Sequence, residues 1–173
     1  NILHSIHEGI SCGFLDAVFP KLTLLCYLFI GAAVVFLFFR KFRQGGAAMC
    51  GAILLSLLVG NLLLKNLVAR DRPCWIDPDF LQLLVSVPKD FSFPSAHTMI
   101  SVSAAAALFH YSKALGIPAL VIAALVGFSR LYLFVHFPTD VLAGAVIGVI
   151  LAVVSCIVTD KIAAKIKSKK AVN

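Results

Sequence analysis

Long runs of residues without a formal charge limit how this chain can fold more than any other feature of its sequence. A helix needs about 17–25 residues to cross a bilayer. Three runs meet this length: Leu22–Phe39 with 18 residues, Gln44–Leu64 with 21 and Val141–Thr159 with 19. Apolar residues fill 61% of the 173 positions and charged residues only 13%, against about 45–50% and about 25% in soluble domains. A water-soluble domain and a disordered chain are therefore excluded.

Two shorter uncharged runs complete the predicted bundle. Thr98–Ser112 has 15 residues and Ala114–Ser129 has 16, so either one alone also fits a buried core helix. The first run reaches back through His97, and the second continues past Arg130. Polar residues at the end of a span face the protein interior, which makes the apolar run look short. We predict an all-α, polytopic transmembrane helix bundle of five spans, in a single domain over residues 1–173.

The first residues follow a different pattern, in which apolar positions recur every three or four residues. These positions are Leu3, Ile6, Ile10, Phe14 and Val18, with polar residues between them. This spacing is typical of an amphipathic helix that lies in the membrane interface. We therefore expect residues 1–21 to form one interfacial helix and residues 22–160 to form the bundle.

The distribution of basic residues gives the orientation of the bundle. The formal net charge is +7, but the basic residues gather in two clusters: residues 40–43, and five lysines within residues 161–173. Such clusters mark cytoplasmic loops of membrane proteins, which argues against nucleic-acid binding. With five spans both clusters lie inside, residues 161–173 form a basic cytoplasmic tail, and the loop of residues 65–97 lies outside.

Three short polar segments fall at one end of the predicted spans. They follow the second span, open the third span, and join the fourth span to the fifth. Their chemically notable residues are Lys65, Arg72, Ser95, His97, Ser129, Arg130, His136 and Asp140. The topology, derived from the apolar runs alone, places all three segments at the external face. Charged residues at membrane depth need partners or a function, so we expect a common site there.

The charge balance of these segments indicates an anionic ligand. Lys65, Arg72 and Arg130 bring three positive charges, and we expect Asp140 to be the one motif carboxylate committed to the site. A tetrahedral dianion such as phosphate would complete the balance, since arginine binds phosphate oxygens through a planar fork of donors. The Ser95 hydroxyl and the backbone N–H groups that open the third span can donate as well.

Two histidines supply the reactive groups. His136 lies four residues before Asp140, and residues four apart share one face of a helix. We expect the carboxylate to accept a hydrogen bond from the far ring N–H of His136, which leaves the other nitrogen as a nucleophile. Pro138 suits a first helical turn, so His136 should lie at the lip of the fifth span. His97 is able to protonate a leaving alkoxide and later to activate water.

In order and spacing, the three segments resemble the signature motifs of the type 2 phosphatidic acid phosphatase (PAP2) superfamily, in its bacterial membrane lipid phosphatase branch. The matching patterns are Lys65-x6-Arg72-Pro73, Pro94-Ser95-Ala96-His97 and Ser129-Arg130-x5-His136-x3-Asp140. The resemblance covers about residues 60–150. Ala96 replaces the glycine that is usual in the family, and most members have six spans. A methyl group at position 96 is tolerable where the backbone is not at positive φ, although it narrows the space beside the phosphate.

The resemblance implies a role for each matching residue. His136 would attack phosphorus to give a phosphohistidine, Asp140 would orient His136, and His97 would protonate the leaving group and then help water to release phosphate. The equatorial oxygens would be held by Lys65, Arg72, Ser95, the Ala96 N–H and Arg130. No metal or other cofactor is implied, because the basic cluster neutralises the charge that Mg²⁺ neutralises elsewhere.

The predicted function is hydrolysis of a phosphate monoester or diphosphate on a lipid. At headgroup depth, acyl or prenyl chains can stay in the bilayer while the phosphate enters the site. Undecaprenyl diphosphate, phosphatidylglycerol phosphate and phosphatidic acid are all open as substrates, on the extracytoplasmic face of a bacterial cytoplasmic membrane. The alternatives are a non-catalytic lipid-phosphate binder or transporter on the same fold, and a structural scaffold. A binder needs only the cations, whereas two histidines and an orienting aspartate serve phosphoryl transfer.

Other residues receive structural interpretations. Arg70 and Asp71 lie inside the x6 stretch and are expected to form a solvated local pair. His110, near the cytoplasmic end of the third span, is expected to be structural. Gly144 and Gly148 form a GxxxG pattern, which we interpret as close packing inside the bundle rather than dimerisation.

Overall fold

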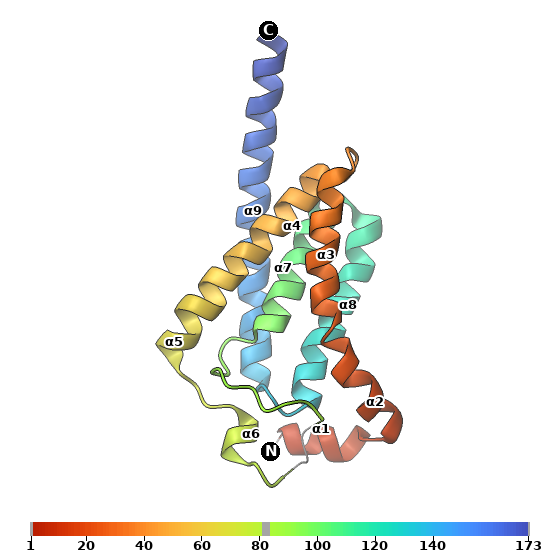
Figure 1. The fold of residues 1–173 in the computed structure, drawn as a ribbon, viewed down its shortest axis with the longest axis vertical. Helices are drawn as coiled ribbons and strands as arrows, with labels where there is room; N and C mark the ends of the chain where they lie inside the picture. The colour runs from red at the N-terminus through yellow and green to blue at the C-terminus, as the bar shows by residue number, and fades with distance from the viewer. Residues whose placement is uncertain (1, 81–83, 173) are drawn as a thin grey trace.

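The computed structural model describes residues 2–80 and 84–172, and this part of the chain contains helices and no strands (Figure 1). The elements are α1 (Ile2–Ile10), α2 (Gly13–Leu22), α3 (Leu25–Phe38), α4 (Arg43–Ser56), the π-helix η1 (Leu57–Leu64), α5 (Lys65–Val68), α6 (Pro73–Ile76), α7 (Ala96–Tyr111), α8 (Lys113–Tyr132) and α9 (Pro138–Val172). Helix α7 lies inside the bundle and packs against α3, α4, α8 and α9. The prediction of an all-α helix bundle is confirmed.

The number of membrane spans differs from the prediction. The described residues contain four helical segments that are long and apolar enough to cross a membrane, namely Gly13–Phe38, Arg43–Ile76, Lys113–Tyr132 and Pro138–Lys169. The predicted third span is α7, whose 16 residues fall short of that length, so the described residues hold four spans of this length and not the five predicted. Ala104, Ala105 and Ala107 of α7 are fully buried. A helix enclosed by other helices needs little lipid-facing surface, so it can be short and end in polar residues.

The N-terminal segment forms two helices rather than the single helix expected for residues 1–21. Cys12 has an extended backbone, with φ −156° and ψ 155°, and separates α1 from α2. Helix α1 lies across the end of the bundle opposite the C-terminus (Figure 1). Leu3 and Phe19 are buried there in a cluster with the residues that follow α8. The chain changes direction because these two side chains pack on protein, and an interfacial position of the segment stays a prediction.

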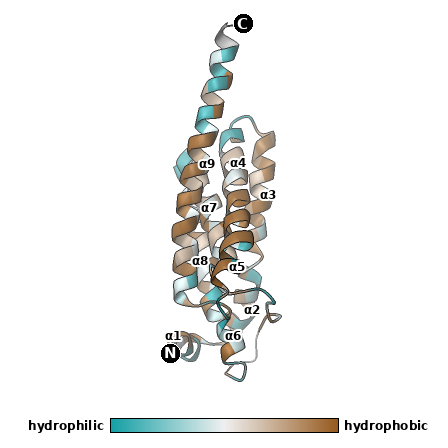
Figure 2. Cartoon of the chain, turned by 90° about the vertical axis from the view of Figure 1, so that its left-hand side faces the viewer, coloured by the Kyte–Doolittle hydropathy of each residue, from teal (hydrophilic) through white to brown (hydrophobic). Residues whose placement is uncertain are grey.

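The second span continues beyond its uncharged run. Helix α4 passes into η1 and then α5, and the helix ends at Ala69, whose backbone is left-handed with φ 45°. Lys65 therefore lies inside the helix with its side chain only 7% exposed, and not at the start of an external loop as predicted. π-helical turns are rare in proteins, and where they occur they often lie at functional sites. Figure 2 shows that apolar residues dominate this helix and the middle of the bundle, whereas the last turns of α9 are hydrophilic.

Glycine allows close packing of α9 against α7, as interpreted from the GxxxG pattern. A Cβ atom on Gly144 would lie 2.8 Å from the Ser95 carbonyl oxygen, and one on Gly148 would lie 2.8 Å from the Met99 carbonyl oxygen. Backbone atoms cannot retreat from such a contact as a flexible side chain can. The interpretation as packing inside the bundle is therefore confirmed.

We expect Gly148→Val to lower the thermal unfolding midpoint in detergent, with a loss of about 3 kcal/mol in the free energy of unfolding. This figure is at the upper end of overpacking effects, because the added carbons meet the backbone of α7. The matched control is Val149→Ile at the next position, which is 45% exposed and should change stability by less than about 0.5 kcal/mol. Equal midpoints for the two variants would contradict the packing argument.

Candidate active site

A cavity of about 530 Å³ lies at the end of the bundle where α1 and α6 are found. Six of the eight predicted site residues line it, namely Lys65, Arg72, Ala96, His97, Arg130 and His136. The other two, Ser95 and Asp140, are fully buried behind this lining. The structure thus brings segments far apart in the sequence to one place, as the topology predicted.

Helix ends position most of these side chains. Arg72 precedes Pro73, which opens α6, and Ala96 and His97 form the first turn of α7. Arg130 lies in the last turn of α8, and His136 lies in the short connection to α9. The ends of α5 and α8 lie near the starts of α7 and α9. The polar residues therefore gather at one end of the bundle, and none of them has to be buried in its apolar middle. Ala96 is not among the described residues with positive φ, so its methyl group creates no backbone strain.

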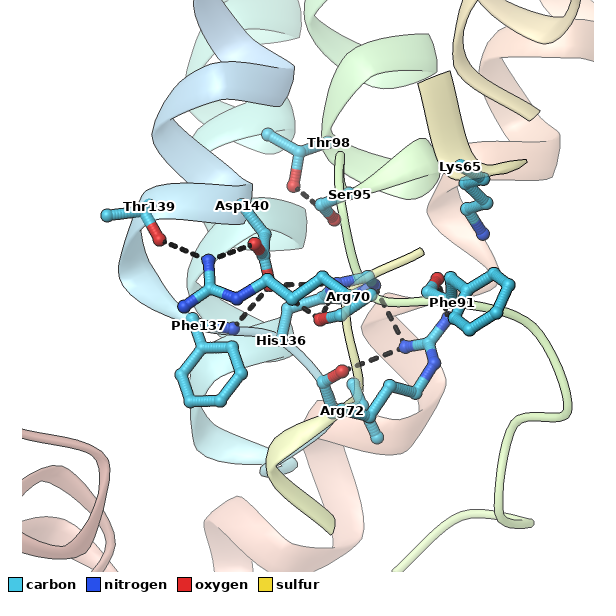
Figure 3. Close-up of polar contacts among 12 residues, drawn as sticks. Lys65, Arg70, Arg72, Phe91, Ser95, Thr98, His136, Phe137, Thr139 and Asp140 are labelled. Atoms are coloured by element: carbon cyan, nitrogen blue, oxygen red, sulfur yellow. Dashed lines mark hydrogen bonds and ion pairs between the residues drawn. The ribbon is translucent and has the colours of Figure 1, made fainter. Parts of the chain in front are cut away.

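The His136 ring has Arg72 on its Nε2 side, and Ser92 and Asp140 on its Nδ1 side (Figure 3). Arg72 Nη1 lies 3.2 Å from its Nε2, and Ser92 Oγ lies 3.4 Å from its Nδ1. Asp140 Oδ2 is 3.8 Å from Nδ1, which is longer than a hydrogen bond. The direct hydrogen bond expected between His136 and Asp140 is therefore not formed, and Ser92 Oγ instead contacts both groups.

The environment keeps His136 neutral at pH 7. Burial disfavours the charged ring, and the positive charges of Arg72 and Lys65 act in the same direction. Asp140 opposes them. Together these effects lower the pKa of His136 from 6.5 to about 4. Because a guanidinium only donates hydrogen bonds, the Nε2 atom that faces Arg72 carries the lone pair.

Asp140 accepts hydrogen bonds from three donors. Ser92 Oγ donates at 2.5 Å, and the Phe137 N–H and Arg70 Nη1 both donate at 2.8 Å. Arg70 also donates to Thr139 Oγ1 at 2.7 Å, and its guanidinium lies 4.0 Å from the centre of the Phe137 ring (Figure 3). The solvated pair expected between Arg70 and the neighbouring aspartate is therefore wrong. Arg70, which the sequence analysis interpreted as solvated, thus contacts the first turn of α9.

Lys65 and Arg72 share a second carboxylate that the sequence analysis missed. Asp90 forms an ion pair with Lys65 and lies 2.8 Å from Arg72 Nη2 through its Oδ1. Its backbone oxygen accepts from Arg72 Nε at 2.7 Å. Burial alone would raise the pKa of Asp90, but the hydrogen bonds and charges of Lys65 and Arg72 outweigh it and lower the pKa. Asp90 lies outside the three motifs, so it adds a second carboxylate to a charge balance that was drawn from the motif residues alone.

Arg130 and Ser95 are fixed by contacts within the protein. Arg130 is 4% exposed and binds the Ser129 hydroxyl and Thr23 of the α2–α3 turn. Ser95 Oγ accepts from Thr98 Oγ1 at 3.0 Å, and the Ser95 N–H donates to the Asp140 carbonyl oxygen at 3.1 Å. Arg130 reaches the cavity, whereas Ser95 anchors the start of α7 to α9.

The cavity wall also includes apolar side chains. They come from the α2–α3 turn, α3, η1 and α7, and are Leu24, Tyr27, Ile30, Leu57 and Ile100. The cations and histidines thus meet a hydrophobic wall in one cavity. Within the described residues, no group of three or more His, Cys, Asp or Glu side chains is arranged to hold a metal ion.

Known proteins are similar to this chain in sequence or in fold. Undecaprenyl-diphosphatase of Sulfolobus acidocaldarius is 32% identical over 124 residues, which cover 70% of this chain and 59% of that protein. The chain therefore spans less than two thirds of the length of this relative. The crystal structure of Aquifex aeolicus LpxE matches with a TM-score of 0.76 and 28% identity, over 88% of this chain and 92% of that one.

A second solved structure is the first transmembrane PAP2-type phosphatidylglycerolphosphate phosphatase from Bacillus subtilis. It matches with a TM-score of 0.72 and 31% identity, over 93% of this chain and 84% of that one. The family model of the PAP2 superfamily matches residues 45–163, a range that contains all three polar segments. On the strength of this match and of the shared fold, the chain belongs to the PAP2 superfamily.

Proposed function

We propose that this protein is an integral membrane phosphatase that hydrolyses a phosphate monoester or diphosphate on a lipid through a phosphohistidine intermediate. The observation that carries the proposal is the position of His136 Nε2, which lies 3.2 Å from Arg72 Nη1 in a cavity shared with Lys65, Arg130 and His97. Relatives named as an undecaprenyl-diphosphatase and a phosphatidylglycerolphosphate phosphatase support the same class of reaction.

The reaction requires two displacements at phosphorus. In the first, the Nε2 lone pair of His136 attacks phosphorus and the bond to the leaving oxygen breaks, while His97 gives that oxygen a proton. In the second, water attacks the phosphohistidine, His97 takes a proton from the water, and the phosphorus–nitrogen bond breaks to release phosphate. The bound dianion stabilises the imidazolium of His97 that the first step needs.

The cations hold the charge that develops on the phosphoryl oxygens. Lys65, Arg72 and Arg130 serve this purpose in the proposal, with the Ala96 N–H at the start of α7. The Ser95 hydroxyl lies behind the cavity lining and supports this phosphate-binding cluster from there. The substrate phosphate has to share Lys65 and Arg72 with Asp90, or displace it from them.

Two features support a lipid substrate at the external leaflet. The apolar wall of the cavity suits acyl or prenyl chains, which remain in the bilayer while the phosphate reaches His136. The basic residues of the α3–α4 turn and of the end of α9 lie at the end of the bundle opposite the cavity (Figure 1). Because such residues mark the cytoplasmic side, we place the cavity on the extracytoplasmic face of a bacterial cytoplasmic membrane.

Release of inorganic phosphate from a panel of lipids tests the proposal. The full chain, purified in detergent with EDTA, is given undecaprenyl diphosphate, phosphatidylglycerol phosphate and phosphatidic acid. We expect turnover of at least one lipid at a rate that EDTA does not change, since the cations need no metal to assist them. A strict requirement for divalent metal would contradict the mechanism. Binding of these lipids without release would identify a non-catalytic binder instead.

A further inference from the structure

The Ser92 hydroxyl contacts both of the residues that the sequence analysis paired directly. The 3.8 Å separation of His136 Nδ1 and Asp140 Oδ2 is too long for a hydrogen bond, whose donor–acceptor distance stays below about 3.5 Å. The Ser92 hydroxyl oxygen is 2.5 Å from Asp140 Oδ2 and 3.4 Å from His136 Nδ1. Ser92 and Asp140 are fully buried and His136 is 2% exposed, so bulk water does not replace the hydroxyl.

Donor and acceptor roles allow one consistent arrangement of protons in this chain of contacts. Asp140 also receives a backbone N–H and the Arg70 guanidinium, so the Ser92 hydroxyl donates to it and keeps its lone pairs for the ring. On the other side of the ring, Arg72 can only donate to Nε2. The neutral imidazole of His136 therefore carries its proton on Nδ1, facing Ser92.

The backbone around Ser92 fixes the position of its hydroxyl. The Ser92 N–H donates to the Arg70 carbonyl oxygen at 2.8 Å, and the Arg70 side chain in turn binds Asp140. A few residues later, the Ser95 N–H donates to the Asp140 carbonyl oxygen. These contacts hold the segment before α7 against the first turn of α9, so the hydroxyl stays in contact with both the ring and the carboxylate.

We propose that Ser92 is a positioning residue, whose hydroxyl accepts from His136 Nδ1–H, donates to Asp140 and thereby keeps Nε2 directed into the cavity. The inference rests on the proposed function of His136. When Nε2 bonds to phosphorus the ring becomes cationic, and the Ser92–Asp140 pair stabilises the charge at Nδ1–H. Without the hydroxyl, the ring proton faces an acceptor 3.8 Å away, and Arg72 alone is left to orient the ring.

Steady-state kinetics of Ser92→Ala and Ser92→Cys test this role. Both variants remove the strong hydrogen-bonding group, and the cysteine nearly keeps the shape if the alanine variant does not fold. We expect kcat to fall about 10–100-fold with KM unchanged within about twofold, because Ser92 does not line the cavity. In an Asp140→Asn background the same substitutions should have no further effect on kcat, since the chain of contacts is already broken.

The matched control is Ser155→Ala on α9. Ser155 is buried and donates to the Ala48 carbonyl oxygen at 2.8 Å, so this variant loses a buried serine hydrogen bond away from the cavity and should keep wild-type kcat. Wild-type kcat in both Ser92 variants would overturn the proposal. The proposal would also be overturned if the fold-reductions in kcat caused by the Ser92 and Asp140 substitutions multiplied in the double variant, as they do for independent residues.

A second measurement does not depend on turnover. Nitrogen-15 shifts of the labelled imidazoles at pH 7 report which ring nitrogen carries the proton, and His136→Ala assigns the signal. We expect the Nδ1-protonated tautomer in the wild type and a shifted Nδ1 signal in a Ser92 variant, because the Nδ1–H loses its acceptor. An Nε2-protonated ring in the wild type, or identical shifts in the variant, would refute the role of Ser92. Absence of phosphate release by the wild type would instead refute the proposed function.

Discussion

Replacing His136 with alanine is expected to reduce phosphate release by about 10⁴-fold or more, because the reaction loses the atom that attacks phosphorus. Besides the ring, Arg72 Nη1 contacts the Val135 carbonyl oxygen, and His97, the other imidazole that lines the cavity, serves proton transfer in the proposal. With its pKa lowered to about 4, His136 offers an unprotonated nitrogen at pH 7 without help from a base. Initial rates of the purified wild type and variant on the preferred lipid measure the loss.

His110→Ala is the control for general effects of removing a histidine. His110 lies at the opposite end of α7, with its Nε2 3.1 Å from Asp160 Oδ2, and we expect wild-type turnover from this variant. Rapid quenching with radiolabelled substrate should leave acid-labile phosphate on the wild type and none on His136→Ala. If His136→Ala kept more than about one hundredth of the wild-type rate, another group would have to be the nucleophile.

The common location of the three polar segments could be predicted because helix direction alternates along a bundle. Uncharged runs gave the approximate position of each helix, and every polar segment lies at an end of one. Residues at such ends meet when the helices pack side by side, whatever the detailed packing. This reasoning needs no knowledge of individual contacts, which is why Lys65, Arg130 and His136 were placed together correctly.

The partners of these residues could not be predicted in the same way. Arg70, Asp90 and Ser92 lie in irregular backbone between helices, where no periodicity indicates which way a side chain points. Arg70 reaches Asp140 across 70 positions of sequence, and Asp90 reaches Arg72 across 18. Only the folded chain shows that the backbone of Ser92 pairs with that of Arg70 and carries both side chains to the start of α9.

Two errors in the predicted fold, the number of spans and the single N-terminal helix, have a related cause. In both cases the segment is buried against protein instead of lipid. Hydrophobic length is a guide to spans that face the bilayer, but α7 packs against four other helices and is free of that requirement. The apolar spacing of the first residues correctly indicates helix. It does not show that Leu3 is fully buried, nor that the chain turns at Cys12 to bring this about.

Arg72→Lys is expected to lower kcat/KM by about 10²–10³-fold, although it keeps the charge. The guanidinium makes contacts from all three nitrogens: Nε to the Asp90 carbonyl oxygen, Nη1 to the Val135 carbonyl oxygen and His136, and Nη2 to the carboxylate of Asp90. A lysine ammonium is a single point of charge and cannot reproduce this planar fork. The expected loss has the size found when one preorganised hydrogen-bond donor to a developing negative charge is removed.

Further variants show whether the positive charge of Arg72 or the planar shape of its guanidinium is needed. Arg40→Lys, at an exposed position beside the α3–α4 turn, makes the same chemical change and should leave kcat/KM unaltered. Arg72→Ala should lose more than Arg72→Lys, because it removes the positive charge as well and leaves the buried Val135 carbonyl oxygen without its donor. If Arg72→Lys matched the wild type within about fivefold, charge alone would suffice, and the fork that faces His136 Nε2 would have no part in fixing the nucleophile.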